Sequence, residues 1–240
     1  MIRVFLGYDS GQTVAYHVAC NSIHRLSSRP VAIAPLMLSQ LAHVFERPRD
    51  PRQSTEFSFT RFLVPYLCDY AGWAIYADCD IVLREDIAAL WALRDERYAV
   101  QVVKHVHVPT SPVKFLGRQQ SIYARKNWSS VMLLNNARCR ALTPDYVRHA
   151  SGLDLHQFRW LAGDEEIGAL PETWNHLVAS DMAPAAAPAI LHYTQGGPWF
   201  EEYRACAHAA QWWDELARAQ QPLPAAEMTP AGESVAAAGS

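Results

Sequence analysis

Short apolar runs separated by turn-forming residues alternate with segments of helical periodicity along most of this chain. Six of these runs are nearly continuous, which is typical of strands buried on both faces of a sheet. They lie at residues 2–7, 31–36, 73–77, 98–103, 130–135 and 189–193. We expect one helix over residues 13–24 and another beginning at Asp86. Alternating strands and helices predict an α/β fold with a mostly parallel central sheet covered by helices on both faces.

Two further helices are expected from the same periodicity. In residues 57–70 apolar side chains recur every three or four positions, which predicts an amphipathic helix kinked at Pro65 and ended by Gly72. A shorter helical tract is expected over residues 163–170. The region between the strands at 98–103 and 130–135 is long, basic and interrupted by prolines, so it predicts a functional loop.

Composition sets the domain organisation. The chain has 240 residues, of which 50% are hydrophobic and 19% charged, which fits one α/β domain and excludes a disordered or fibrous chain. We expect that domain over residues 1–220 and a disordered Ala- and Pro-rich tail over 221–240. No transmembrane segment or leader is expected, and five widely spaced cysteines without a C-x-x-C pair indicate a cytoplasmic protein with reduced thiols.

Charge is distributed unevenly. Between Glu96 and Asp145 lie eight Lys and Arg residues and no acidic residue, a stretch that we call the basic segment (residues 97–144). Because the whole chain has a net charge of −3, the remainder carries −11. A segregated basic segment predicts an anionic ligand such as phosphate, diphosphate or nucleic acid, with a solvated basic loop as the alternative.

The sharpest chemical feature is Asp78-Cys79-Asp80 at the end of the apolar run 73–77. Residues two apart on a strand project to the same side, so the two carboxylates should converge where open α/β sheets bind ligands. Two carboxylates that close favour a cation between them, and their hard oxygens suit Mg²⁺ or Mn²⁺. A pair of solvated turn residues or a helix cap is the alternative.

Several motifs follow one another in a recognisable order. They are Thr60-Arg61-Phe62, the run 73–77, Asp78-Cys79-Asp80-Ile81, Ser129 to Asn135, Asp164-Glu165-Glu166-Ile167, His192-Tyr193-Thr194 and Gly197-Pro198-Trp199. From about residue 2 to residue 200 this series resembles the GT-A fold glycosyltransferases of family 8, the glycogenin and lipopolysaccharide galactosyltransferase group. The resemblance implies a single GT-A, Rossmann-like domain.

The resemblance implies a metal site. Both aspartates of the D-x-D motif, Asp78 and Asp80, would bind Mn²⁺ together with His192 of the late His-Tyr motif. A histidine beside carboxylates fits Mn²⁺ better than Mg²⁺, although Mg²⁺ remains possible. Without the family pattern, His192 is equally well a satisfied histidine within a strand.

The resemblance also implies a nucleotide pocket. Gly7, Tyr8 and Asp9 would line it, with Asp9 accepting a hydrogen bond from uracil or ribose, unless Asp9 only caps its turn. Arg61 matches an arginine that reaches the diphosphate, where its planar fork suits a pair of phosphate oxygens, and its alternative is a surface helix charge. Cys79, between the two aspartates, is counted among the nucleotide-contacting positions.

Sugar and acceptor positions are implied in the same way. Ser130 and Asn135 would lie near the sugar and the acceptor. Asp164 and Glu165 match the acidic pair that faces the donor sugar in the retaining enzymes, which makes them the catalytic candidates. Surface acids at a helix start, where negative charge is favourable, are the alternative.

One position departs from the family pattern. The lysine that usually precedes Pro-Trp and reaches the diphosphate is replaced by Gly196-Gly197. The backbone N–H groups of these glycines are expected to approach the phosphates, and Lys104 and Lys114 of the basic segment are expected to supply the missing charge.

The predicted function is that of a metal-dependent retaining glycosyltransferase, a hexosyltransferase. It would move a sugar from a nucleotide-diphosphate sugar, expected to be a UDP-sugar, to a hydroxyl acceptor on a glycan, lipopolysaccharide, lipid-linked or protein partner. One alternative is a nucleotidyltransferase acting on sugar phosphates, although residues 7–12 lack the basic residues such enzymes carry there. Another is a noncatalytic anion- or nucleic-acid-binding module, which the few aromatics of the basic segment disfavour, so no nucleic-acid partner is expected.

Overall fold

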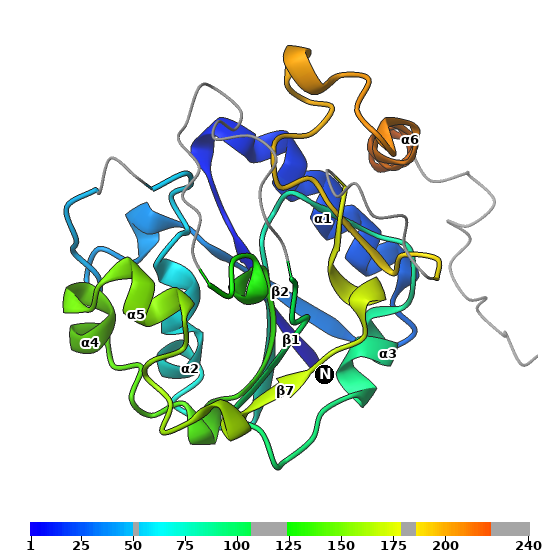
Figure 1. The fold of residues 1–240 in the computed structure, drawn as a ribbon. Helices are drawn as coiled ribbons and strands as arrows, with labels where there is room; N and C mark the ends of the chain where they lie inside the picture. Colours follow the sequence, from blue (N-terminus) through cyan, green and yellow to red (C-terminus); the bar gives the residue numbers. More distant parts are fainter. Residues whose placement is uncertain (50–52, 107–123, 179–185, 222–240) are drawn as a thin grey trace, which may run out of the picture.

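The computed structural model describes residues 1–49, 53–106, 124–178 and 186–221, and a six-stranded sheet runs through its centre (Figure 1). Its strand order is β2-β1-β3-β6-β5-β7. The strands are β1 (Ile2–Gly7), β2 (Val31–Leu36), β3 (Trp73–Ala77), β5 (Val100–Val102), β6 (Val131–Asn135) and β7 (Ile167–Ala169). The pairings β1 with β2, β1 with β3 and β5 with β7 are parallel, whereas β6 runs antiparallel to both neighbours.

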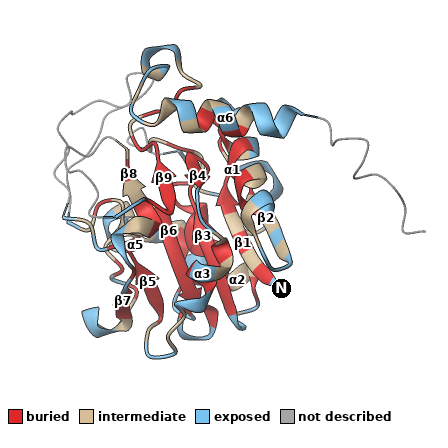
Figure 2. Ribbon diagram, turned by 90° about the vertical axis from the view of Figure 1, so that its right-hand side faces the viewer, coloured by how far each residue is buried: buried red, intermediate tan, exposed pale blue. Residues whose placement is uncertain are grey.

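Helices cover both faces of this sheet, as the sequence predicts. They lie on its two sides (Figure 1). The first face carries α1 (Thr13–Leu26) and α3 (Ile87–Ala92), and the second carries α2 (Val64–Leu67), α4 (Pro144–His149) and α5 (Gly152–His156). Alternate strand residues divide between them: Ile75 packs with the α1 and α3 cluster, and Tyr76 with the α2, α4 and α5 cluster. The α/β prediction is therefore confirmed, and the core strands are buried on both sides (Figure 2).

A second, three-stranded sheet adjoins the first, which the sequence pattern did not indicate. Its order is β4-β9-β8, with β4 (Ile81–Leu83) antiparallel to β9 (Ile190–His192) and β8 (His176–Leu177) parallel to β9. The chain passes from β3 of the large sheet to β4 of the small sheet through residues 78–80. The D-x-D triplet therefore lies at the junction of the two sheets.

The helix α6 (Ala209–Gln220) closes the described chain by packing on α1. Its Glu215 carboxylate accepts hydrogen bonds from Asn21 and Arg25 of α1, at 2.7 and 2.6 Å. Single 3-10 turns connect the other elements. They lie at Ser10–Gln12, Leu38–Gln40, Thr60–Leu63, Trp128–Ser130, Asn136–Arg138, Asp164–Glu166, Glu172–Asn175 and Glu201–Tyr203.

The predicted helix over residues 57–70 is shorter and divided. A 3-10 turn at Thr60–Leu63 leads into α2, and Pro65 lies in the first turn of α2, where its missing N–H is harmless, rather than at a kink. The following residues, Asp69 and Tyr70, adopt positive φ angles of 51° and 52°, which ends the helix before Gly72.

The predicted helical tract over residues 163–170 is wrong. Only Asp164–Glu166 form a 3-10 turn, and Ile167–Ala169 form the edge strand β7. A Cβ atom on Gly168 would lie 2.5 Å from the ring of Tyr98, so the strand depends on a glycine at its centre. The predicted tail, 221–240, lies outside the described residues except for residue 221, and so do residues 107–123 of the predicted loop.

Candidate active site

The carboxyl ends of two parallel strands form the floor of the site. Leu6 of β1 pairs with Ala77 of β3, so the two residues that follow, Gly7 and Asp78, lie level at one edge of the large sheet. The antiparallel strand β6 begins at this edge, where the Asp78 N–H donates to the Ser130 carbonyl at 2.9 Å. We call this the D-x-D edge.

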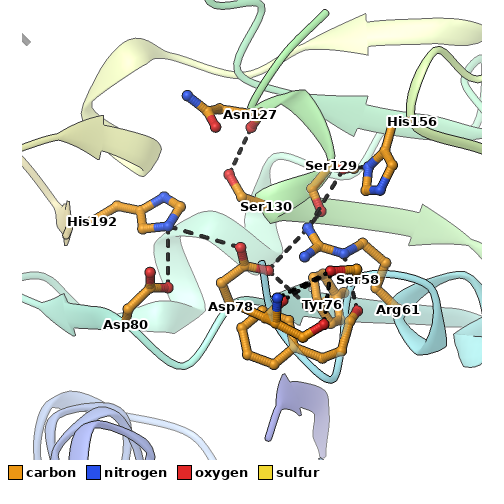
Figure 3. Close-up of polar contacts among 12 residues, drawn as sticks. Ser58, Arg61, Tyr76, Asp78, Asp80, Asn127, Ser129, Ser130, His156 and His192 are labelled. Carbon is orange, nitrogen blue, oxygen red and sulfur yellow. Dashed lines mark hydrogen bonds and ion pairs between the residues drawn. The ribbon is translucent and has the colours of Figure 1, made fainter. Parts of the chain in front are cut away.

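The small sheet brings a histidine to the same place. In the β4 and β9 pairing His192 lies opposite Ile81, and the Tyr193 N–H donates to the Asp80 carbonyl at 2.9 Å. As a result the His192 Nε2 atom lies 3.2 Å from Asp80 Oδ1 and 3.9 Å from Asp78 Oδ2 (Figure 3). The three side chains that the sequence suggested as metal ligands therefore converge.

The donor set of this cluster suits a divalent cation. Each side chain offers one ligand atom, and these atoms all lie within 4.8 Å of one another, a separation that one ion with ligand distances of about 2.4 Å spans. Asp78, Asp80 and His192 are only 8%, 6% and 2% exposed. In the described part of the chain no other group of three His, Cys, Asp or Glu side chains could hold a metal ion.

One oxygen of the Asp78 carboxylate is held by a hydroxyl group and a guanidinium group. Its Oδ1 atom accepts a hydrogen bond from the Tyr76 hydroxyl at 2.7 Å and lies 3.0 Å from Arg61 Nη1, which leaves Oδ2 facing His192. Burial raises the pKa of the Asp78 carboxyl, Arg61 opposes that rise, and the nearby Asp80 carboxylate adds to it. A buried carboxylate in this environment is stabilised in its charged form by a cation.

Arg61 itself is anchored below the D-x-D edge. Its guanidinium donates to the Ser129 carbonyl at 2.9 Å and to the Phe57 carbonyl at 3.3 Å, and only 5% of the residue is exposed. The alternative, a surface helix charge, is therefore excluded, and Arg61 lies at the D-x-D edge in contact with Asp78, while its predicted contact with the diphosphate stays a prediction. Beside it, the Ser129 hydroxyl is 2.8 Å from His156 Nδ1, and burial, then Arg61, lower the pKa of His156 to about 3.

The loop after β1 is tightly built. A Cβ atom on Gly7 would lie 2.5 Å from the ring of Phe57, so only glycine fits there. The buried Asp9 carboxylate accepts from Gly11 N at 2.8 Å and from Glu56 N at 3.1 Å, so it caps the turn as the alternative interpretation expects. The Tyr8 hydroxyl lies 3.2 Å from Thr13 Oγ1. The predicted contacts of this loop with a nucleotide stay predictions.

Further predicted contacts lie around the D-x-D edge. Lys104 is exposed two residues after β5, and its Nζ lies 5.8 Å from the centre of the Trp128 ring. Gly196 follows β9 with a φ angle of 134°, which only glycine adopts readily, and a Cβ atom on Gly197 would collide with Trp199. Cys79 is buried, and burial raises its pKa well above the usual value, so its thiol is protonated. Lys114 lies outside the described residues.

Asn135 does not join the cluster. It pairs with Trp73, at the opposite end of β3 from Ala77, and its side chain donates to Glu96 at 3.0 Å. The structure therefore places Ser130 but not Asn135 at the D-x-D edge, and their predicted places near the sugar and the acceptor stay predictions. The physical reason for their separation is the length of β6, since four steps of about 3.3 Å separate the two ends of that strand.

The predicted catalytic pair lies next to the edge strand β7. Asp164 and Glu165 precede β7, whose first residue Ile167 pairs with Val100 at the end of β5 remote from the D-x-D edge. The exposed Asp164 carboxylate is bound by Arg125 at 2.6 Å. Arg125 lies two residues before Asn127, whose carbonyl contacts Ser130 at the D-x-D edge, and the predicted catalytic role of Asp164 and Glu165 stays a prediction.

Among the described residues of the basic segment, 97–106 and 124–144, the charges do not form one patch. At the end of the sheet remote from the D-x-D edge, Arg97 pairs with Asp95, and Arg138 pairs with Glu166 at 3.2 Å. Lys104 lies near the D-x-D edge instead. Described basic residues that are close in the sequence therefore lie at two different ends of the sheet.

One residue that sequence reasoning missed contacts the cluster directly. The Asn175 side chain is fully buried, and its Oδ1 atom lies 2.8 Å from His192 Nδ1. No sequence signal marks Asn175, because it is 17 residues away from His192 and meets it only through the pairing of β8 with β9.

Comparison with known proteins gives one family. The family model for glycosyl transferase family 8 matches residues 12–140. Protein CDI of Arabidopsis thaliana is 42% identical over 222 residues, which cover 89% of this chain and 85% of that protein. Within the described residues no helix has the length and apolar character needed to span a membrane, and the expected cytoplasmic location stays a prediction.

Solved structures share the fold at low identity. The bifunctional glycosyltransferase WbbM matches with a TM-score of 0.64 at 14% identity, over 90% of this chain but only 49% of the WbbM chain. The galactosyltransferase LgtC, solved with donor and acceptor sugar analogues, matches with a TM-score of 0.60 at 12% identity, over 92% of this chain and 97% of its own. GlyE of Streptococcus pneumoniae matches with a TM-score of 0.59 at 15% identity.

Proposed function

The chain belongs to glycosyl transferase family 8 and is a glycosyltransferase with the GT-A fold, and we propose that it moves a sugar from a nucleotide-diphosphate donor to a hydroxyl acceptor in a metal-dependent reaction. The proposed donor is a UDP-sugar and the proposed ion is Mn²⁺. The sugar and the chemical nature of the acceptor depend on the pocket and are left open.

One observation carries this proposal. Asp78, Asp80 and His192 are contributed by two different sheets and yet present three ligand atoms within 4.8 Å, buried at the carboxyl edge of the large sheet. Open α/β sheets bind their ligands at this edge. Two carboxylates and one imidazole are a donor set suited to Mn²⁺.

When bound, the ion would supply positive charge to the diphosphate as the bond between sugar and phosphate breaks. The chain's own residues prepare for that. Tyr76 and Arg61 hold Oδ1 of Asp78, so Oδ2, on the side of His192, is the oxygen that would bind the ion. Because these donors fix the carboxylate in place, little rearrangement is needed on binding.

Lys104 and the glycine turn after β9 are the proposed replacements for the missing family lysine. Gly196 and Gly197 follow Tyr193, whose backbone is bonded to Asp80, so their N–H groups lie on the chain segment next to the cluster. Lys104 extends from the carboxyl end of β5, the same edge of the large sheet. Both features are able to favour a diphosphate there.

Retention of the anomeric configuration is proposed from the family resemblance. A catalytic role for Asp164 and Glu165 is proposed from the same resemblance, and Asp164 is bound by Arg125 of the segment that leads into Ser130 at the D-x-D edge. NMR analysis of the anomeric linkage in the product tests retention independently of the metal site.

The test of the site is calorimetric titration of the 240-residue protein with UDP, with and without Mn²⁺. We expect UDP to bind at least tenfold more tightly with Mn²⁺, and we expect Asp80→Asn to remove that difference, because one ligand loses its charge. Glu96→Gln, at the remote end of the sheet, is the matched control and should bind UDP as the unchanged protein does.

Two results would contradict the proposal. One is UDP binding that is equally tight without Mn²⁺, and the other is Asp80→Asn binding UDP and Mn²⁺ as tightly as the unchanged protein. Release of pyrophosphate from a nucleoside triphosphate and a sugar phosphate would instead favour a nucleotidyltransferase.

A further inference from the structure

We propose that Asn175 is a positioning residue, which holds His192 in the tautomer whose Nε2 lone pair faces Asp78 and Asp80. This inference rests on the metal site of the proposed function and adds to it a residue outside the ligand set. Asn175 ends the turn Glu172–Asn175 directly before β8, is fully buried, and has its Oδ1 atom 2.8 Å from His192 Nδ1.

The backbone carbonyl of Asn127 determines the direction of each hydrogen bond in the series that leads to His192. The Asn127 carbonyl can only accept, so the Ser130 hydroxyl, 2.6 Å away, donates to it (Figure 3). Having used its only hydrogen, Ser130 Oγ is an acceptor for the Asn175 side chain at 3.0 Å. The Asn175 amide also donates to the Asn127 carbonyl at 3.3 Å.

These two acceptors determine which way the Asn175 amide points. Its nitrogen must face Ser130 and Asn127, since a flipped amide would direct an oxygen at a carbonyl oxygen that has no hydrogen to give. The amide oxygen therefore faces His192, and His192 Nδ1 must be the donor. In a neutral imidazole the other nitrogen, Nε2, then carries the lone pair.

The lone pair points to the place where a metal ligand is needed. His192 Nε2 is 3.2 Å from Asp80 Oδ1 and 3.9 Å from Asp78 Oδ2, so it is directed at both carboxylates. Histidines that bind metals commonly donate their other N–H to a fixed acceptor, which sets tautomer and ring orientation. Asn175 fills this role with an oxygen that two further contacts hold in place.

The fold explains why the acceptor is rigid. Asn127 has φ and ψ angles of 65° and 0°, a left-handed conformation that asparagine tolerates better than most residues and that turns its carbonyl toward Ser130. The parallel pairing of β8 with β9 places Leu177 opposite His192, so that Asn175, two residues earlier, lies within reach of the imidazole.

The test is titration of the whole protein with Mn²⁺ alone, followed by the electron paramagnetic resonance signal of free Mn²⁺. We expect Asn175→Ala to weaken Mn²⁺ binding by about 10- to 100-fold, the usual effect of removing such a partner. Asn136→Ala is the matched control. Asn136 is also a fully buried asparagine, but its side chain donates to the Ala71 carbonyl at the remote end of the sheet, and its loss should leave Mn²⁺ binding unchanged.

A conservative variant separates positioning from a merely structural role. Asn175→Asp keeps an oxygen toward His192 Nδ1 but cannot donate to Asn127 or Ser130. We expect it to lose stability and still bind Mn²⁺ within about threefold of the unchanged protein, because the acceptor that fixes the tautomer is retained. In addition, ¹⁵N spectra of the metal-free protein, with the His192 signals assigned by comparison with His192→Asn, should show hydrogen on Nδ1.

Separate results overturn the inference and the proposed function. Normal Mn²⁺ binding by Asn175→Ala, together with lost binding by Asp80→Asn, overturns the role of Asn175 alone. An unchanged protein that binds no Mn²⁺ overturns the metal site. If Asn175→Ala does not fold, a His192 Nδ1 that carries no hydrogen in the ¹⁵N spectrum of the unchanged protein, or Mn²⁺ binding by Asn175→Asp more than tenfold weaker, overturns the inference.

Discussion

The two ends of the large sheet arrange their polar residues in opposite ways. At the remote end, where β3 begins, Glu96 accepts from Trp73 Nε1 and from Asn135, and Arg3 donates to two backbone carbonyls. At the D-x-D edge, two carboxylates and an imidazole are directed at one another instead. The remote end pairs donors with acceptors, whereas the D-x-D edge gathers ligand atoms that a cation would satisfy together.

This contrast teaches what distinguishes a functional from a structural cluster in this fold. Both ends contain buried asparagines and an arginine, so residue type does not separate them. The difference is that at the remote end Glu96 and Arg3 pair directly with groups of opposite hydrogen-bonding character. At the D-x-D edge the His192 imidazole donates to Asn175 and Asn175 donates to Ser130, while the other imidazole nitrogen faces two carboxylates.

The largest expected difference between the two ends concerns their arginines. Arg61→Met removes the cation beside the buried Asp78 carboxylate, and losing one partner of a buried pair costs about 3–5 kcal/mol. Arg3→Met removes only hydrogen bonds to carbonyls and should cost about 1 kcal/mol. Urea unfolding of both variants without metal checks this, and equal losses would contradict the contrast.

A smaller effect should appear in the pH dependence of stability. The pKa of His156 is lowered to about 3, below the value of about 6.5 in an unfolded chain, so the unfolded state takes up the proton first as the pH falls. The stability is thus present above pH about 6.5 and is lost progressively toward pH about 3. Between pH about 7.5 and about 5.5 the loss should be about 1.4 kcal/mol.

Paired variants isolate this contribution. His156→Gln should abolish that part of the slope of unfolding free energy against pH, while His24→Gln, at an exposed histidine of α1, should leave the slope as it is. The measurement is the urea midpoint at the two pH values. An unchanged slope in His156→Gln would show that His156 is not the buried neutral group described above.

The smallest expected effect concerns the exposed basic residues. Lys104→Gln should weaken binding of UDP by a few-fold, at most about 1 kcal/mol, because an exposed charge is screened by salt. Arg97→Gln, in the same basic segment but paired with Asp95 at the remote end, should have no effect. Calorimetry at low and high salt measures UDP binding by both variants. Equal weakening of UDP binding in the two variants would contradict the distinction between Lys104 and the remote Arg97.

The sequence predicted the D-x-D edge because its signal is local. An apolar run that ends in two acids is visible without knowing any pairing, and the observed strand β3 has the predicted bounds. The position of His192 came from the family resemblance, since a histidine in an apolar strand has no local mark of ligation. Asn175 had neither signal and became visible only through the β8 and β9 pairing.

The sequence could not predict the structure where strand direction or a single glycine decided it. An apolar run does not reveal whether a strand is parallel, and because β6 is antiparallel, its first residues and not Asn135 reach the D-x-D edge. At residues 163–170 three consecutive acids suggest a helix start, but Gly168 packs against Tyr98 and lets Ile167–Ala169 join the sheet.

The junction of the two sheets at residues 78–80 also constrains how this chain can change. Asp78 directly follows strand β3 of the large sheet, and Asp80 directly precedes strand β4 of the small sheet. In β4, Ile81 lies opposite His192. An insertion or deletion of one residue at Cys79 would shift β4 by one position along β9, and such a slip turns every side chain of a strand to the opposite face. The spacing of the two acids is therefore fixed by backbone geometry, so length variation should be excluded here even where substitutions are tolerated.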